Sequence, residues 1–263
     1  MKRVIYQVCL GKQSESTLYK KCIESVAAYC GRYDITHIVQ RKAILRIAPN
    51  AFTSNRSTDS YVKHGGFLPI FEKENAFDLI NEYDQIAIVD ADIFIREDAP
   101  NIFEDFGTSD AWGGVVEREI PITDEYKKKI NNYSRMQYHT LHNKGICFKP
   151  DSFGYEFFNM GLILINSDKF KPFLKGQTAK QFLHRPEFQD FIDGTGAWKW
   201  STDQTLLNYF IKKYKVPTKH MSFKWNGLYT ATTKIKECYF IHFFLKDKLP
   251  NSGENFEELL KTL

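Results

Sequence analysis

Apolar runs and amphipathic stretches alternate along the first part of the chain. Residues 4–10 begin with an apolar run, a polar turn follows at residues 11–14, and residues 16–29 carry apolar side chains at helical spacing. Residues 35–39 are again rich in β-branched side chains. A strand, a helix and a second strand at this spacing predict a βαβ unit, and therefore a parallel sheet.

The strongest apolar run covers residues 86–95 and is interrupted by two carboxylates, Asp90 and Asp92. Because it lacks polar alternation, it predicts a strand that is covered on both faces. Side chains two residues apart on a strand point the same way, so Asp90 and Asp92 are expected to form a pair. A helix predicted over residues 71–83 leads into this strand. The pair should then lie at the carboxyl end of a strand, where open α/β sheets bind ligands.

The rest of the pattern completes a single α/β domain. The remaining predicted elements are strands at residues 112–116, 157–166 and 237–244 and a helix at residues 205–214. Ser201 and Gln204 fit a capping box for this helix, and residues 50–66 predict a long loop. With no internal repeat and no linker, we predict one domain over residues 1–263. Its expected architecture is a Rossmann-like, open, mostly parallel sheet flanked by helices.

Composition limits the class of protein. Hydrophobic residues make up 43 % of the 263 residues, which is ample for one large core. A net charge of +4 is too small to predict nucleic-acid binding, although it allows a local basic pocket for a phosphate group. The five scattered cysteines form no Cys-x-x-Cys pair and are expected to be reduced. The N-terminus enters a strand pattern at once, and no apolar run approaches the ~20 residues of a membrane helix. We therefore expect no signal peptide, no membrane span and a cytoplasmic location.

The acidic pair poses an electrostatic problem. Two like charges beside buried apolar residues destabilise the fold if they are left unpaired. A divalent cation is the usual compensation, and carboxylate oxygens suit Mn²⁺ or Mg²⁺. The alternative is a solvated turn, because Asp-x-Asp is frequent in loops. The apolar flanks of Asp90 and Asp92 favour the metal site.

Four short motifs follow one another along the chain: Asp90-Ala91-Asp92, Asn159-Met160-Gly161-Leu162, Asp203-Gln204, and His242 followed six residues later by Lys248. In this order they resemble the nucleotide-sugar glycosyltransferases of the GT-A fold. The most similar are those of glycosyltransferase family 8, which includes glycogenin and bacterial galactosyltransferases. Their order and their spread over the chain make the set specific.

The resemblance implies a metal site and a nucleotide. Asp90 and Asp92, with Ala91 between them, would bind Mn²⁺ and the diphosphate of a UDP-sugar, with His242 as the third metal ligand. A histidine nitrogen favours Mn²⁺ over Mg²⁺, which remains the alternative cation. Such a cation acts as a Lewis acid on the departing diphosphate. The alternative for His242 is a neutral, hydrogen-bonded core residue of its apolar strand.

The resemblance also implies a sugar pocket. Asn159 and Gly161 would line it, Asp203 would bind hydroxyls of the donor sugar, and Gln204 would lie near the reacting carbon. Asp203 also has a purely structural interpretation, because a carboxylate at a helix start gains up to about 1 kcal/mol from the helix dipole.

Contacts to the phosphates and the base are assigned to five further residues. Lys73 is expected to reach the sugar or a phosphate, and Lys248, or Lys246 in its place, to add positive charge at the outer phosphate. Val8 and Leu10, at the end of the first strand, are loosely assigned to the uracil base. A lysine that points into solvent is the alternative for each of the three cations.

One position departs from the family pattern. Family members carry Gly three residues after the histidine, whereas this chain has Leu245. Gly permits a positive φ and a close approach of the backbone to a phosphate, and Leu resists both. We therefore expect the loop to run differently or to hold the diphosphate less closely.

These observations predict a metal-dependent glycosyltransferase that moves a hexose-type sugar from a UDP-sugar to an acceptor hydroxyl, with retention of configuration. Residues 1–107 would form the donor half and residues 108–263 the acceptor half. One alternative is a haloacid-dehalogenase-like phosphatase, in which a Thr normally stands at the position of Phe94. Another is a catalytically degenerate protein that binds a nucleotide or glycan. The donor sugar, the acceptor and the oligomeric state leave no signature in the sequence.

Overall fold

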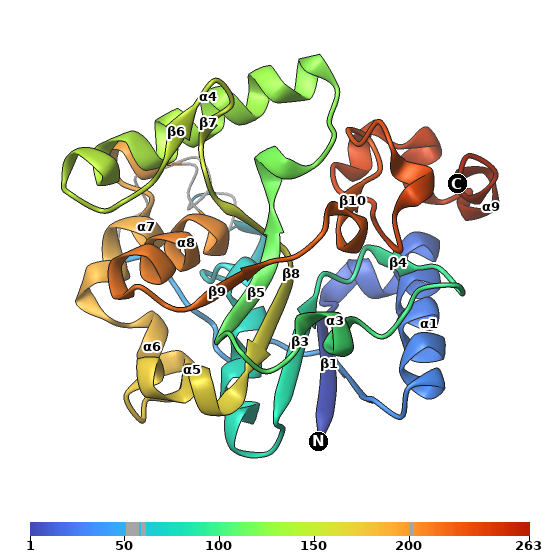
Figure 1. The fold of residues 1–263 in the computed structure, drawn as a ribbon, viewed down its shortest axis with the longest axis horizontal. Coiled ribbons are helices and arrows are strands. Elements are labelled where there is room, and N and C mark those ends of the chain that lie inside the picture. Colours follow the sequence, from blue (N-terminus) through green and yellow to red (C-terminus); the bar gives the residue numbers. More distant parts are fainter. Residues whose placement is uncertain (51–57, 59–61, 200–201) are drawn as a thin grey trace.

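The apolar runs form a six-stranded sheet with the order β2-β1-β3-β8-β5-β9 (Figure 1). The computed structural model describes residues 1–50, 58, 62–199 and 202–263. The strands of this sheet are β1 (Arg3–Val8), β2 (Thr36–Gln40), β3 (Gln85–Val89), β5 (Trp112–Val116), β8 (Phe158–Asn166) and β9 (Thr218–His220). Only β8 runs antiparallel to its neighbours in this sheet. The predicted open, mostly parallel α/β sheet is confirmed.

The reversed direction of β8 brings two distant motifs together. Because β8 is antiparallel to β3, its first residues lie beside the last residues of β3, and Val89 pairs with Leu162. The backbone N–H of Asp90 then donates to the carbonyl of Gly161 at 2.9 Å. The start of β8 is therefore fixed beside the acidic pair.

A second, three-stranded sheet has the order β10-β11-β4 and consists of β10 (Gly227–Leu228), β11 (Phe240–His242) and β4 (Ile93–Ile95). The prediction of one strand over residues 86–95 is wrong, because β3 ends at Val89 and β4 belongs to this second sheet. Between them the N–H of Ile93 donates to the carbonyl of Asp90, which closes a turn. The strand predicted over residues 237–244 is likewise shorter than expected.

The helices lie on two sides of the large sheet. Figure 1 shows α1 and the C-terminal segments on one side and α5 to α8 on the other. The helices are α1 (Thr17–Arg32), α3 (Ile102–Phe106), α4 (Asp124–Asn143), α5 (Ser167–Leu174), α6 (Ala179–Leu183), α7 (Gln189–Asp193), α8 (Asp203–Tyr214) and α9 (Phe256–Leu260). A two-stranded hairpin, β6 (Pro150–Asp151) and β7 (Gly154–Tyr155), pairs beside α4.

Short 3-10 helices connect these elements. They are η1 (Gly11–Glu15), η2 (Pro69–Phe71), η3 (Lys73–Asn81), η4 (Glu117–Glu119), η5 (Pro186–Phe188), η6 (Gly196–Trp198), η7 (Phe223–Trp225), η8 (Ile235–Glu237), η9 (Lys246–Lys248) and η10 (Pro250–Gly253). The helix predicted over residues 71–83 is therefore a 3-10 helix. Just before η3, the buried carboxylate of its N-cap residue Glu72 accepts the backbone N–H groups of Ile44, Leu45 and Arg46, which holds the preceding loop against this helix.

Two apolar clusters support the two sheets. The larger one packs the central strands against the helices through aromatic pairs such as Phe77 with Phe170 and Phe182 with Phe210. The smaller one packs Ile241 and Phe243 of the second sheet region against Leu18 of α1. Because Ile241 and Phe243 flank His242, this second cluster fixes the strand that carries the predicted metal ligand.

Several smaller predictions can be compared with the structure. The helices predicted over residues 16–29 and 205–214 are present as α1 and α8, and Thr202 caps α8 by accepting the N–H of Gln204. The capping box proposed for Ser201 lies outside the described residues, as does most of the loop predicted over residues 50–66. All five cysteines are free thiols, and of these Cys147 is exposed. Within the described part of the chain, no helix has both the length and the apolar character needed to cross a bilayer.

Candidate active site

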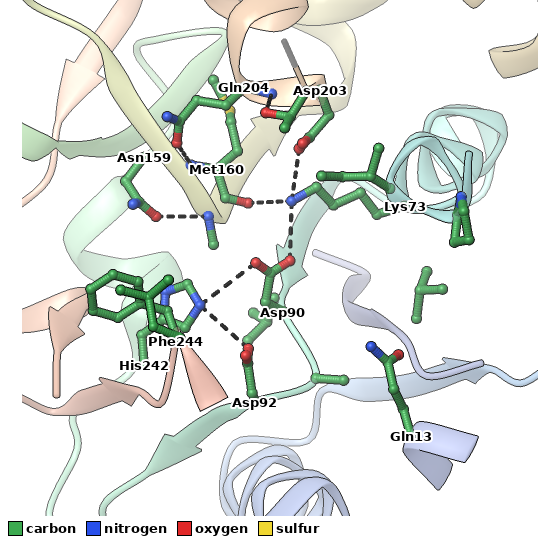
Figure 2. Close-up of a pocket in the computed structure, with 18 of the residues that line it drawn as sticks. Gln13, Lys73, Asp90, Asp92, Asn159, Met160, Asp203, Gln204, His242 and Phe244 are labelled. Carbon is green, nitrogen blue, oxygen red and sulfur yellow. Dashed lines mark hydrogen bonds and ion pairs between the residues drawn. The ribbon is translucent and has the colours of Figure 1, made fainter. Parts of the chain in front are cut away.

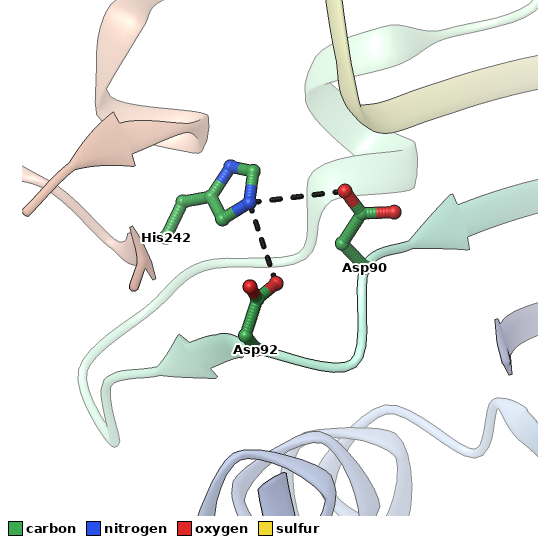
Figure 3. Close-up of side chains that lie close together, drawn as sticks. All are labelled: Asp90, Asp92 and His242. Atoms are coloured by element: carbon green, nitrogen blue, oxygen red, sulfur yellow. Dashed lines mark ion pairs between the residues drawn. The ribbon is translucent and has the colours of Figure 1, made fainter. Parts of the chain in front are cut away.

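The side chains of Asp90, Asp92 and His242 point toward one another (Figure 3). The His242 Nε2 atom lies 3.3 Å from Asp92 Oδ1 and 3.7 Å from Asp90 Oδ2. One potential ligand atom from each of the three lies within 4.8 Å of the others. The fold therefore brings together the three residues that were predicted as metal ligands, although they come from two sheets.

Hydrogen bonds to its two main-chain carbonyls hold the turn that carries the two carboxylates. On one side, the side-chain amide of Gln7, a residue of β1, donates to the carbonyl of Asp90 at 3.2 Å. On the other side, the N–H of Phe243 donates to the carbonyl of Asp92 at 3.0 Å. The main chain is therefore fixed on both sides of the turn, and the carboxylates are held facing His242.

Gly161 leaves room for the imidazole of His242. A Cβ atom at Gly161 would lie 2.4 Å from Cε1 and 2.6 Å from Nδ1 of the ring, which is closer than real Cβ contacts. Any side chain at this position would push His242 away from the two carboxylates. The packing of His242 therefore explains the glycine at position 161, independently of the predicted space for a sugar.

The charges of the three side chains depend on one another. Burial favours a neutral imidazole, yet the charge and hydrogen bond of Asp92, together with the charge of Asp90, raise the pKa of His242. Burial also favours a neutral Asp92, but the charge and hydrogen bond of His242 lower the pKa of that carboxyl. A positive charge between the two carboxylates is therefore favoured. Two carboxylate oxygens and one imidazole nitrogen are a donor set that fits Mn²⁺.

Lys73 forms a second positive centre next to this group (Figure 2). Its Nζ atom lies 2.8 Å from Asp203 Oδ2, 3.0 Å from Asp90 Oδ1 and 2.7 Å from the Met160 carbonyl oxygen. Although burial opposes the charge, Asp203 and Asp90 raise the pKa of Lys73. Each oxygen of Asp90 thus faces a different cation, His242 on one side and Lys73 on the other. Lys73 is buried rather than directed into solvent.

The other predicted sugar-binding residues lie around Lys73. Asp203 is buried at the start of α8. Gln204 accepts the N–H of Met160 at 3.3 Å and donates to the hydroxyl of Tyr133 at 3.4 Å. Asn159 is also buried, and its oxygen accepts the N–H of Gly161 at 2.9 Å. These side chains are held by protein groups on the wall of the same pocket (Figure 2).

The pocket has a volume of about 730 Å³, within the range of small-molecule sites. Most of the predicted site residues line it: Val8, Leu10, Lys73, Asp90, Ala91, Asp92, Asn159, Gly161, Asp203, Gln204 and His242. These residues come from both sides of the predicted boundary between residues 107 and 108. The division into a donor half and an acceptor half stays a prediction.

The two lysines assigned to the outer phosphate do not line this pocket. The Nζ atom of Lys246 contacts Ser16 Oγ at 2.9 Å and Glu254 Oε1 at 3.0 Å. Lys248 is exposed beside Lys129, and contact with that ammonium group lowers the pKa of Lys248. Phosphate binding by either lysine stays a prediction.

Leu245 adopts a backbone conformation that favours glycine. Its φ is 57° and its ψ is 56°, in the left-handed region, and its side chain is 46 % exposed at the pocket rim. Leu245 thus adopts the positive φ that a Leu side chain resists, and a looser hold on the diphosphate stays a prediction. The N–H of Lys248 donates to the Leu245 carbonyl at 2.8 Å, so the turn is closed despite the cost of this φ.

Several pocket residues were not predicted from the sequence. Tyr126 and Tyr133, seven residues apart on α4, line the pocket, as does the buried Glu117. The helix itself has detectable signals, since Thr123 is an N-cap and acidic residues fill the first turn. Glu117 and the buried Asn226, which contacts His242, have no local sequence signal.

Three solved structures are similar to this chain over nearly its whole length. A glycosyltransferase involved in the glycosylation of the major capsid of PBCV-1 is 11 % identical, with a TM-score of 0.53, and the match covers 98 % of this chain and 99 % of that one. Mouse xyloside xylosyltransferase 1, in its apo form, is 14 % identical, with a TM-score of 0.51 and coverages of 95 % and 100 %. The galactosyltransferase LgtC, in complex with donor and acceptor sugar analogues, is 14 % identical, with a TM-score of 0.51 and coverages of 99 % and 96 %.

A scan against protein-family models and a search of curated proteins find no match. At the identities of the structural matches, the likeness shows the fold. The chain has the GT-A fold, as the four motifs predict.

Proposed function

We propose that this chain is a metal-dependent glycosyltransferase that moves a hexose-type sugar from a UDP-sugar to an acceptor hydroxyl, with retention of configuration. The observation that carries the proposal is the convergence of Asp90, Asp92 and His242 beside Asp203 and Gln204 in one pocket of a GT-A fold. The same pocket thus joins a cation-binding group to side chains that hydrogen-bond hydroxyls.

Asp90, Asp92 and His242 would hold Mn²⁺, which supplies Lewis-acid stabilisation of the departing diphosphate when bound. Lys73 adds a fixed positive charge and orients Asp90 and Asp203 at the same time. Val8 and Leu10 form apolar wall on the β1 side, which suits the predicted uracil contacts. Asp203 and Gln204, on the wall of the same pocket, would bind the sugar that follows the diphosphate.

The proposed retention rests on the resemblance to family 8. A retaining double displacement needs a nucleophile, and the buried carboxylate of Glu117 has both oxygens engaged, by Tyr126 and by Asn159. Attack from the same face as the leaving group needs no such nucleophile, because the departing phosphate takes the proton of the acceptor hydroxyl. On the acceptor side, Tyr126 and Tyr133 offer aromatic surface on which a sugar ring can pack.

The deciding experiment is a calorimetric screen of nucleoside diphosphate sugars with and without Mn²⁺, followed by an assay of UDP release. We expect binding and turnover of a UDP-sugar to require Mn²⁺. Asp92→Ala should reduce turnover by about 100-fold or more, because it removes one of three cation ligands. The matched control is Asp98→Ala, since Asp98 is an exposed carboxylate paired with Arg96. Full turnover in excess chelator would overturn the proposal.

A further inference from the structure

A buried row of amide side chains lies behind His242. The His242 Nδ1 atom contacts Asn226 Oδ1 at 3.1 Å, and Asn226 Nδ2 contacts Asn159 Oδ1 at 2.8 Å. Asn159 Nδ2 donates to Glu117 Oε2 at 2.9 Å. Asn226 is fully buried, and Asn159 and Glu117 are at least nine-tenths buried. None of these partners is close to His242 in the sequence.

The direction of the hydrogen bonds in this row follows from one backbone group. The N–H of Gly161 can only donate, and it points at the Asn159 side chain, so the atom it meets is the oxygen. Asn226 must then approach this oxygen with its amide nitrogen, which turns the oxygen of Asn226 toward His242. This assignment does not depend on whether Glu117 is charged.

An oxygen facing Nδ1 determines which tautomer His242 adopts. The oxygen of Asn226 accepts a hydrogen bond, so Nδ1 must carry a proton. In the neutral imidazole, Nε2 then has a free lone pair, and Nε2 is the atom that faces Asp90 and Asp92. This tautomer is the one that can bind a cation between the two carboxylates.

We infer that Asn226 is a positioning residue that fixes His242 as the Nδ1–H tautomer and presents Nε2 to the metal site. This inference rests on the proposed metal-dependent function. An asparagine supplies the acceptor without a charge, next to a site that already holds Asp90, Asp92 and Glu117. A carboxylate in its place would add a fourth acidic group to a buried region.

The row also limits what Asn159 can do for a donor sugar. The Asn159 oxygen already accepts from Gly161 and from Asn226, and one amide hydrogen is used by Glu117. One N–H therefore remains for a ligand. Asn159 accordingly contributes more to the position of His242, through Asn226, than to direct contact with the sugar.

The first test reads the tautomer in the wild-type protein and needs a variant only to assign the signals. In metal-free protein, ¹⁵N–¹H correlations through the ring of His242, assigned with His242→Gln, distinguish Nδ1–H from Nε2–H at a pH above the raised pKa. We expect the Nδ1–H form. Finding the Nε2–H form would overturn the inference.

The second test measures Mn²⁺ affinity by calorimetry. Asn226→Leu should weaken Mn²⁺ binding by about tenfold to 100-fold, as is typical when a partner of a metal-binding histidine is lost. Asn226→Asp keeps an acceptor oxygen for Nδ1 but loses the amide group that donates to Asn159, so it should keep the Nδ1–H tautomer and lower the stability of the fold. The matched control is Asn166→Leu, because Asn166 is likewise a buried, hydrogen-bonded asparagine, held by Gln85 and by the carbonyls of Gly107 and Asp110, but lies away from His242. It should lower stability and leave Mn²⁺ affinity unchanged.

The outcomes separate this inference from the proposed function. Unchanged Mn²⁺ affinity in folded Asn226→Leu would overturn the role of Asn226. Absence of Mn²⁺ binding by the wild-type protein would instead overturn the metal-dependent function, and the tautomer measurement would still decide the arrangement of the ring.

Discussion

The two sides of His242 differ in how completely the site is formed. Toward the acidic pair, each functional side chain meets a partner, and the main chain of Asp90 and Asp92 is bonded on both sides. On the other side, the loop from Leu245 to Lys248 places one lysine against Glu254 and the other beside Lys129. One side is arranged before any ligand binds, and the other is not.

The difference has a structural cause. The acidic pair lies between two strands, and His242 lies on a third, so sheet hydrogen bonds fix the direction of each side chain. The loop after Phe244 forms a single 3-10 turn, η9, whose lysines lie against neighbouring surface segments, Lys246 at Glu254 and Lys248 at Lys129. Groups that are carried by strands are positioned more precisely than groups on loops. A phosphate ligand would therefore have to reorganise the loop, whereas a cation would not have to reorganise the acidic pair.

Replacing Lys73 with Met should have the largest effect on the formed side. Burial and the nearby Asp203 raise the pKa of Glu74, so its neutral form is favoured and Lys73 is the cation that balances Asp90 and Asp203. Its removal leaves the buried carboxylate of Asp203 without its ion-pair partner, which typically costs about 3–5 kcal/mol, while Asp90 still faces His242. Urea denaturation of the metal-free protein should show this loss in the free energy of unfolding.

The control for this variant is Lys21→Met, which breaks an exposed pair with Glu24. Exposed pairs contribute about 0–1 kcal/mol, so the control should unfold almost like the wild type. Equal stability of Lys73→Met and the control would show that the formed side does not depend on Lys73.

A pH titration of cation binding tests the same side with a smaller effect. Asp92 and Asp90 outweigh burial and raise the pKa of His242 above the value of about 6.5 of an unperturbed histidine. A cation must displace the proton from Nε2, so Mn²⁺ affinity should rise with pH until the raised pKa is passed and then level off. Below that pKa the slope should be up to about tenfold per pH unit.

The stability of the metal-free protein should change in the opposite direction. A raised pKa in the folded state stabilises the protein fully below the pKa of the unfolded state, and this stabilisation is lost as pH rises through the folded pKa.

Calorimetry in buffers of different ionisation enthalpy should detect release of a proton on Mn²⁺ binding, which His242→Gln should abolish. A Mn²⁺ affinity that is flat from about pH 6 to 9 would contradict the charge state of His242.

The same contrast explains which parts could be predicted from the sequence. Fully buried strands such as β5 and β8 are continuous apolar runs, so their pattern is sufficient to find them. The turn at Asp90 was missed because β3 and β4 are both buried and apolar on either side of it. An apolar pattern reports burial, but it does not report which sheet a strand joins.

For the site, the metal ligands were predictable and their supporting residues were not. Asp90, Asp92 and His242 belong to spaced motifs. Asn226 and Glu117 instead act through hydrogen bonds to Asn159, from which they are 67 and 42 residues distant in the sequence. Such contacts arise when the sheets come together and leave no local pattern. The position of Lys246 could not be predicted either, because Lys246 pairs with Glu254, which lies in a segment without a motif.

Leu245→Gly should have the smallest effect and tests the loop side. A left-handed backbone costs a residue with a Cβ about 1–2 kcal/mol, which Gly avoids, while the half-exposed Leu side chain contributes little packing. Urea denaturation should therefore show stability unchanged or raised by up to about 1 kcal/mol. The matched control is Lys215→Gly, since Lys215 ends α8 with a φ of 52° away from the pocket and should respond alike.

Ligand binding separates the two glycine variants. Without a Cβ at residue 245 the backbone can approach a diphosphate more closely, so UDP affinity in the presence of Mn²⁺ should rise a few-fold in Leu245→Gly and stay constant in Lys215→Gly. Affinity for Mn²⁺ alone should change in neither variant, because its ligands lie on the side that is already formed. If Leu245→Gly instead lowered stability by more than about 1 kcal/mol and weakened Mn²⁺ binding, the Leu245 side chain would be part of a rigid site. The contrast between the two sides of His242 would then be wrong.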